Sequence, residues 1–211
     1  MAGSDIKAVF IEADTNAADN ASVATAQLAS PSTDTDFTID GTDASGGVAT
    51  FAAARIVTVT TAGAGDGTKV VTITGTDLDG DTITESITLP ASATTTAGTK
   101  YFKTVTAASI DTTPTGDVSI GHAAGAADIV FGGRSRLKGA FIVNGATAGV
   151  ITFTTNGADG TEILKLGTVA SATAERDVTI PEQGLVFEQG IYIVYQGGTN
   201  EVFTNMTVFR A

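Results

Sequence analysis

The acidic residues with the most suggestive spacing are Asp77, Asp79 and Asp81, which alternate along the chain, with Glu85 shortly after them. Calcium loops use carboxylates at such a spacing because the cation needs several oxygens that converge on one point. The EF-hand pattern is not met, since Gly80 precedes the third aspartate and the glutamate comes too early. Because the flanking residues alternate as in β-strands, we favour a hairpin tip and keep calcium binding as the alternative.

His122 is the only histidine of the chain. As a general base it would need a positioned nucleophile or carboxylate. Asp117 and Asp128 lie near it in the sequence but form no known catalytic motif with it. Cysteine is absent, which excludes disulfides and thiolate metal sites. The alanine- and glycine-rich surroundings of His122 indicate an exposed linker residue, and no catalytic triad can be assigned.

Three further kinds of residue could support a binding or catalytic site. The glycine-rich tracts Gly63–Gly67 and Gly132-Gly133 lack the lysine and hydroxyl residue of a P-loop, so we interpret them as turns. The 23 acidic residues offer many carboxylate pairs for glycoside hydrolysis, but no pair stands out. Tyr192 and Tyr195 could stack on sugar rings, although tyrosine in a strand more often lies in a core or an interface. We therefore expect a protein that is not an enzyme, with no catalytic, cofactor-binding or metal-binding residue.

The charge of the chain argues against a nucleic-acid partner. The net charge is −12 and the isoelectric point is about 4.2, whereas phosphate contacts require clustered lysine and arginine. The one basic concentration, Arg134, Arg136 and Lys138, is interpreted as a solvated or interface-pairing strand entrance. The N-terminus shows no signal-peptide pattern, and no apolar run approaches the roughly 20 residues that span a bilayer. We expect no membrane partner and folding in a reducing cytoplasm.

Alternation of apolar residues and threonine dominates the elements that would position these side chains. From Lys69 to Leu89 two such runs flank a turn rich in aspartate and glycine, which predicts a β-hairpin. Hydrophobic residues make up 42% of the chain, enough to bury a core. Further strands are expected at Phe37–Ile39, Arg55–Thr60, Tyr101–Ile110, Asp117–Ile120, Leu137–Val143, Val150–Thr155, Glu162–Leu166, Asp177–Ile180, Leu185–Glu188, Ile191–Tyr195 and Val202–Phe209.

Short strands separated by turn signals predict an all-β fold of two antiparallel β-sandwich modules in tandem, Ig-like or jelly-roll-like. We expect an N-terminal strand and arm over residues 1–35, a first module over 36–127 and a second over 128–211. The N-terminal strand, at residues 5–13, could join the first module, and Asp14–Thr35 is expected to be a loop or extended arm. Gly121–Ala127 is taken as the linker, and Arg210 and Ala211 as free ends.

Several segments resemble a module of tailed-bacteriophage structural proteins. The residues that carry this resemblance are Ser45–Thr50, Ala54–Thr60, Val71–Asp81 with Thr84–Ile87, and Lys100–Thr106, which is similar to a K-x-F-K-T-V-T segment of that family; together they cover residues 20–121. Leu137–Phe141, Gly160–Leu164 and Gly184–Glu188 resemble small phage virion proteins more loosely. These motifs specify turns and buried strand positions, and the family has no catalytic residues to transfer.

The resemblance implies a virion structural protein that is assembled in the host cytoplasm. The expected role is a capsid decoration (cement) protein or head fibre, homo-oligomeric with a trimer favoured, bound to the major capsid protein or to other virion proteins. A neck, tail or fibre-attachment component, and a carbohydrate-binding module displayed on the virion, remain the alternatives.

Overall fold

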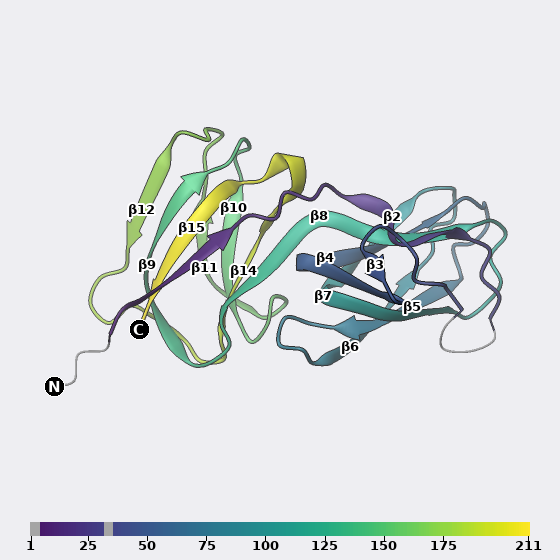
Figure 1. Ribbon diagram of the computed structural model, residues 1–211, viewed down its shortest axis with the longest axis horizontal. Coiled ribbons are helices and arrows are strands. Elements are labelled where there is room, and N and C mark those ends of the chain that lie inside the picture. Colours follow the sequence, from purple (N-terminus) through teal and green to yellow (C-terminus); the bar gives the residue numbers. More distant parts are fainter. Residues whose placement is uncertain (1–4, 32–35) are drawn as a thin grey trace. The chain divides into compact units, whose positions relative to one another are not determined.

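The computed structural model describes residues 5–31 and 36–211. Apart from one short 3₁₀ helix, Gly198–Asn200, every regular element in this described part is a β-strand (Figure 1). Hydrogen bonds join the strands into two open antiparallel sheets, one of five strands and one of ten. The all-β antiparallel class predicted from the alternation of apolar residues is therefore confirmed.

The chain divides into a first unit, Ala18–Ala124, and a second unit, Met1–Ala17 with Gly125–Ala211. The division falls between Ala124 and Gly125, inside the expected linker Gly121–Ala127. These residues do not form a flexible connection, however: they lie inside strand β8 (Val118–Phe131), which continues from the first unit into the second. Small residues are needed there for close strand contact: a Cβ on Gly121 would lie 1.9 Å from the carbonyl oxygen of Asp19. The alanine- and glycine-rich composition, which is typical of a linker, thus lets the backbone of β8 lie close to that of Asp19.

The first unit is built on the strand order β8-β4-β7-β5-β6, with β2 added to β8 and β3 added to β4. Its strands are β2 (Asp19–Gln27), β3 (Ala44–Ser45), β4 (Val48–Thr61), β5 (Val70–Thr76), β6 (Thr82–Thr88), β7 (Thr95–Ile110) and the first part of β8. Strands β5 and β6 pair from Val70↔Thr88 to Thr76↔Thr82. This pairing confirms the predicted hairpin.

One buried cluster joins the two ends of this sheet. It contains Val23 from β2 and Ile87 from β6, which lie at opposite ends of the strand order, together with Val57 and Phe102 from the long central strands. The β4–β7 pairing shifts register at two places, and such bulges bend and twist a strand. The bends let the sheet curve around its own apolar face, because burial of that face provides most of the stabilisation.

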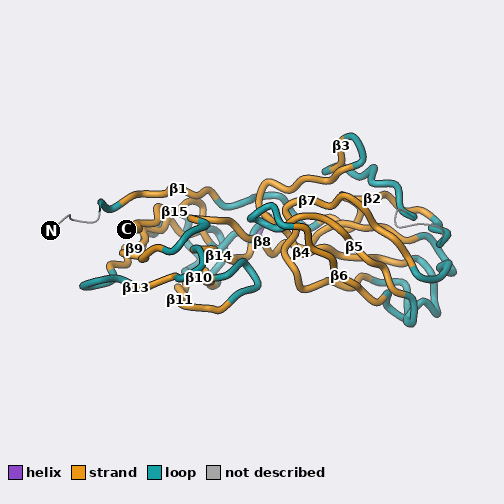
Figure 2. Tube along the Cα trace, turned by 90° about the horizontal axis from the view of Figure 1, so that it is seen from below, coloured by secondary structure: helices purple, strands orange, loops and turns teal. Residues whose placement is uncertain are grey.

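The second unit contains two sheets. In one the order is β1-β15-β9-β12 with β13 beside β9, and in the other β11, β10 and β14 continue onto the end of β8 (Figure 2). The strands are β1 (Lys7–Glu12), β9 (Ser135–Asn144), β10 (Val150–Thr155), β11 (Thr161–Gly167), β12 (Glu175–Thr179), β13 (Leu185–Phe187), β14 (Ile191–Gln196) and β15 (Phe203–Arg210). Ile142, Phe153 and Met206 are among its fully buried side chains.

The N-terminal segment differs from the expectation in two ways. The predicted strand exists as β1, but it pairs with β15 in the second unit, so it does not join the first module. The expected loop or arm over Asp14–Thr35 contains strand β2, of which Ser22, Val23 and Ala24 are buried. Residues 1–4 and 32–35, which belong to the expected arm, lie outside the described residues.

Two smaller expectations are also wrong. Phe37–Ile39 is not a strand, although Phe37 and Ile39 are buried in the core of the first unit. Arg210 and Ala211 are not free: Arg210 is the last residue of β15, and Ala211 exchanges backbone hydrogen bonds of 2.9 and 3.0 Å with Arg136. A pattern of apolar residues reports burial, whereas strand pairing depends on a partner distant in the sequence.

Candidate functional site

The acidic triplet occupies the tip of the β5–β6 hairpin. The Oδ1 atom of Asp77 accepts hydrogen bonds of 2.9 Å from the backbone N–H groups of both Asp79 and Asp81. This carboxylate therefore organises the turn in the manner typical of aspartate. Among the described residues, no group of three or more histidine, aspartate or glutamate side chains is placed to hold a metal ion. The geometry favours the structural role of the triplet over the calcium alternative.

His122 is buried in β8, so its interpretation as an exposed linker residue is wrong. Its Nδ1 atom donates to the carbonyl of Ala123 over 2.9 Å, and its Nε2 atom lies 3.4 Å from Oδ2 of Asp43. The ring packs edge-on against Phe51, with ring centroids 5.4 Å apart. Neither Asp117 nor Asp128 is among these contacts. The ring is thus held by Ala123, Asp43 and Phe51, and none of these three contacts is with a nucleophile.

Arg55 adds a second polar anchor to this part of β8. It is the largest fully buried side chain, and its Nη1 atom donates over 2.8 Å to the carbonyl of Ala124. A buried guanidinium is stable only when it is hydrogen-bonded. Arg55 in β4 and His122 in β8 therefore fix the neighbouring strands of the first unit through specific contacts.

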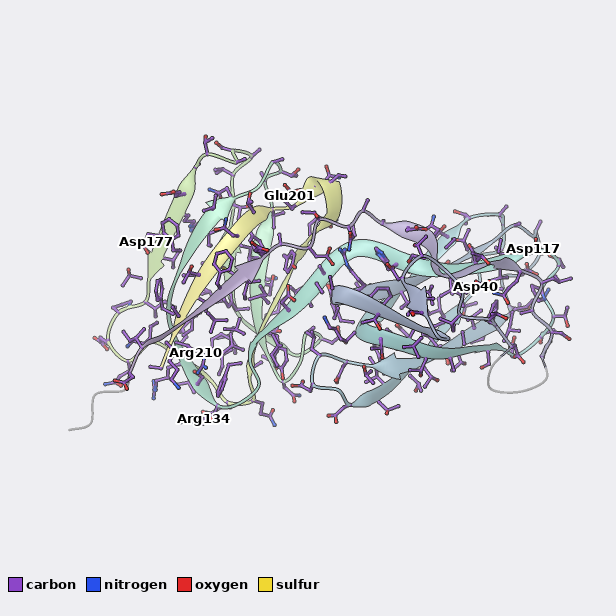
Figure 3. All side chains as sticks on the ribbon, in the orientation of Figure 1. Asp40, Asp117, Arg134, Asp177, Glu201 and Arg210 are labelled. Atoms are coloured by element: carbon purple, nitrogen blue, oxygen red, sulfur yellow. The ribbon has the colours of Figure 1, made fainter. Side chains whose placement is uncertain are left out.

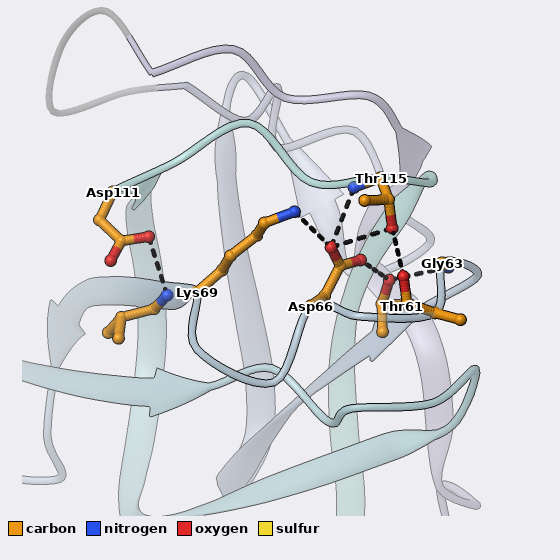
Figure 4. Close-up of polar contacts among 8 residues, drawn as sticks. Thr61, Gly63, Asp66, Lys69, Asp111 and Thr115 are labelled. Atoms are coloured by element: carbon orange, nitrogen blue, oxygen red, sulfur yellow. Dashed lines mark hydrogen bonds and ion pairs between the residues drawn. The ribbon is translucent and has the colours of Figure 1, made fainter.

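A polar cluster around Asp66 was not anticipated from the sequence, which indicated only a glycine-rich turn there. The Asp66 carboxylate is fully buried at the end of the first unit (Figure 4). It accepts hydrogen bonds from Lys69 Nζ (2.5 Å), Thr61 Oγ1 (2.8 Å) and the backbone N–H of Thr115 (2.9 Å). The cluster ties the loop between β4 and β5 to the loop between β7 and β8.

The hydrogen bonds to Asp66 outweigh the effect of its burial. Burial alone would raise the pKa of the carboxyl, but Lys69, Thr115 and Thr61 all stabilise the charged form and hold the pKa well below its usual range. Asp66 is therefore an ionised anchor. A proton donor would have to be protonated, and a metal ligand would need an accessible lone pair. This carboxylate is ionised, and both its oxygens accept hydrogen bonds from the surrounding loops.

Tyr192 and Tyr195 are buried in β14, which removes the stacking surface on which the carbohydrate alternative depended. The hydroxyl of Tyr195 donates to Oδ2 of Asp128 over 2.7 Å and accepts from the backbone N–H of Asp14 over 3.2 Å. Burial and the negative charge of Asp128 raise the pKa of Tyr195. Its ring packs edge-on against Phe203.

The basic residues near β9 bind elements of the second unit. Arg134 forms an exposed ion pair with Glu188, with 2.5 Å between Nε and Oε2, and this carboxylate raises the pKa of the guanidinium. Lys138 Nζ donates to the carbonyl of Glu182 over 2.6 Å, and Arg136 reaches the carbonyl of Gln183. These cations therefore bind loop carbonyls and one carboxylate of their own unit, and the exposed Arg134 ion pair agrees with the solvated interpretation. Pairing with another chain stays a prediction.

Two open hollows lie on the second unit. One, of about 190 Å³, is lined by Thr152, Thr154, Asp159 and Glu162 among others. The other, of about 340 Å³, is more apolar and is lined by Ile6, Gly139, Ile180 and Phe209 among others. Within the residues that the structure describes, no helix is long and apolar enough to cross a membrane. The second hollow is the better candidate for contact with a protein, because it is the more apolar of the two, although Lys138 and Asp177 also line it.

Comparison with known proteins finds no relative: no family model, no curated protein and no solved structure matches the chain.

Proposed function

We propose that this chain is a non-enzymatic structural protein of a bacteriophage virion, a capsid decoration protein or head fibre. One observation carries the proposal. The segments that resemble phage structural modules fold into β4, β5, β6 and β7, which are neighbours in one sheet of the first unit. These motifs, which follow one another between residues 45 and 106, thus form one contiguous structural element, as expected if they were inherited together as a module.

The physical properties of the chain are compatible with a role on the outside of a shell. A decoration protein acts by mass action: it binds the assembled shell in preference to free subunits and so stabilises the assembled state. The net charge of −12 keeps free copies soluble before they bind. Charged side chains are distributed over the surfaces of both units, including Asp40 and Asp117 on the first and Glu201 on the second (Figure 3).

Quantitative mass spectrometry of purified virions that contain this chain tests the proposal. We expect a copy number in fixed proportion to the major capsid protein, together with loss of shell stability when the chain is removed. A few copies per particle would identify a neck, tail or fibre-attachment component. Complete absence from purified particles would contradict the virion role.

A further inference from the structure

Strand β1 is an edge strand whose outer side is unpaired in the described part of the chain. It ends the order β1-β15-β9-β12 and pairs only with β15 there (Figure 1). Antiparallel hydrogen bonds alternate along a strand, and the bond from Ala13 N–H to Thr204 C=O extends this register. The odd-numbered residues therefore bond to β15, and Ala8, Phe10 and Glu12 direct their N–H and C=O groups outward.

One of these outward-directed residues, Phe10, and Ile6, which directly precedes β1, carry apolar side chains that the fold leaves exposed. Ile6 and Phe10 are 61% and 60% exposed, whereas Ile11, on the opposite face of β1, is buried. Ala8 lies opposite Phe209 of β15, and the apolar hollow bounded by Ile6 and Phe209 opens on this face. Unpaired backbone groups and exposed apolar side chains thus coincide on one strand.

Three other edge strands, β12, β11 and β6, carry charged side chains within the strand. Of the remaining edge strands, β3 and β13 are only two and three residues long, and β2 has a single charge, Asp19, at its start. Strand β12 contains Glu175, Arg176 and Asp177 in succession. Figure 3 labels Asp177 on this strand. Strand β11 carries Glu162 and Lys165, and β6 carries Glu85 at its centre. Charged residues at an edge prevent pairing with another chain. In β1 the residues from Ala8 to Ile11 are uncharged, so it lacks this protection.

We propose that β1 pairs antiparallel with β1 of a second copy, which joins the sheets of two chains across a two-fold axis. Antiparallel pairing is self-complementary because outward-directed residues of one copy meet the same residues of the other. It also keeps the two Lys7 side chains apart from each other and the two Glu12 side chains apart from each other, whereas parallel pairing would align like charges. Two acidic chains thus meet along their uncharged stretch. This dimer takes the place of the trimer expected from the sequence.

The oligomeric state of the intact chain in sedimentation experiments tests the pairing. We expect a concentration-dependent dimer. Ala8→Pro removes one outward N–H and leaves the β15 hydrogen bonds in place, because proline is tolerated at an edge position that faces solvent. Phe10→Asp places a negative charge on β1 of each copy, so that the two paired strands repel each other. Each change should raise the dissociation constant roughly tenfold or more. Ile163→Asp, the same type of change on edge strand β11, is the matched control and should leave the dimer intact.

Cysteine cross-linking tests the register, because the chain has no cysteine of its own. Single cysteines at Ala8, Val9 and Phe10 should form disulfide-linked dimers, fastest at the position nearest the two-fold axis. Ile163→Cys should not cross-link. This second measurement decides the question if Ala8→Pro fails to fold, which circular dichroism would show.

A monomeric wild-type chain, a trimer, or a dimer that survives both β1 substitutions would overturn the proposal. Both measurements use the isolated chain. Failure of β1 pairing therefore leaves the virion proposal standing, and absence of the chain from virions would leave the dimer standing.

Discussion

Asp66 and Thr115 lie 49 residues apart in the sequence, yet the backbone N–H of Thr115 donates to the Asp66 carboxylate over 2.9 Å. Lys69 and Thr61 bind the same carboxylate (Figure 4). Two loops at one end of the first unit are thereby held by a single buried anion. The rigidity of this loop end depends on polar contacts, in contrast to the apolar core behind it.

Asp66→Asn should destabilise the first unit by about 1–3 kcal/mol, because a buried group loses its charge-assisted partners. Urea unfolding at neutral pH measures this change. Asp81→Asn, at the exposed hairpin tip, is the matched control and should change stability by less than about 0.5 kcal/mol. Equal stability of the two variants would show that the cluster does not hold the loops.

The contribution of Asp66 should also depend on pH. Its pKa is lower in the folded chain than in the unfolded chain, where aspartate titrates near about 3.9. The stabilisation is therefore present above that pH and is lost as the pH falls below it toward the folded pKa. The stability difference between wild type and Asp66→Asn should be constant near neutrality and shrink in acid. A difference that grows in acid would contradict the assigned direction.

Gly63→Ala should destabilise the same loops by about 1–3 kcal/mol, since overpacking forces neighbours to move. An added Cβ would lie 2.3 Å from Thr115 Oγ1 and 2.7 Å from the backbone nitrogen of Gly116. Thermal unfolding is the measurement. Gly167→Ala is the control, because a Cβ there meets its nearest atoms only at 3.9 Å. If both variants have the melting temperature of the wild type, the space around Gly63 is large enough for a Cβ atom.

Tyr195→Phe should destabilise the second unit by about 1–3 kcal/mol, because Asp128 loses a buried donor. The pKa of Tyr195 is raised in the folded chain, so its stabilisation is complete below the unfolded value of about 10 and declines as the pH rises above it. Denaturant unfolding between neutral and alkaline pH should therefore show a smaller alkaline loss in Tyr195→Phe than in wild type. Identical profiles would contradict this account.

Calcium should leave the melting temperature unchanged, because Asp77 uses its Oδ1 atom to bind backbone N–H groups of its own turn. Asp77→Ala should cost about 0.5–1.5 kcal/mol through loss of those bonds, with or without calcium. Differential scanning calorimetry with calcium and with a chelator measures both effects. If calcium raises the melting temperature of the wild type and Asp77→Ala abolishes this rise, the hairpin tip binds calcium and our interpretation is wrong.

Local patterns in the sequence were sufficient for the hairpin and for most strands. The alternation of Val71 and Ile73 specifies a buried face, and the aspartate–glycine turn specifies a reversal. Local patterns were not sufficient to predict strand β2, because its residues lack a regular apolar spacing. That strand pairs irregularly with β8 and is held by burial of Val23 and Ala24. Its existence depends on neighbours, which no local pattern contains.

The roles of the polar groups could also be predicted only where their hydrogen-bond partners are close in the sequence. The sequence indicated that Asp77 lies in a turn, because both partners of its carboxylate are within the same few residues. It did not indicate the roles of Asp66, His122 or Tyr195. Their partners, Thr115, Asp43 and Asp128, are remote along the chain. Burial is also a property of the whole fold. The exposed interpretation of His122 was wrong, whereas the core position favoured for Tyr195 is confirmed and its sugar-stacking alternative is not.

The sequence by itself determined the all-β class, the absence of thiol chemistry and the acidic charge, because composition and two-residue periodicity are local or summed properties of the chain. The tertiary structure alone decided that β1 joins β15, that β8 continues through the expected linker, and that the outer side of β1 has no partner strand among the described residues. Each of these depends on which distant backbone groups meet. Strand pairing is a long-range choice that neighbouring residues do not encode.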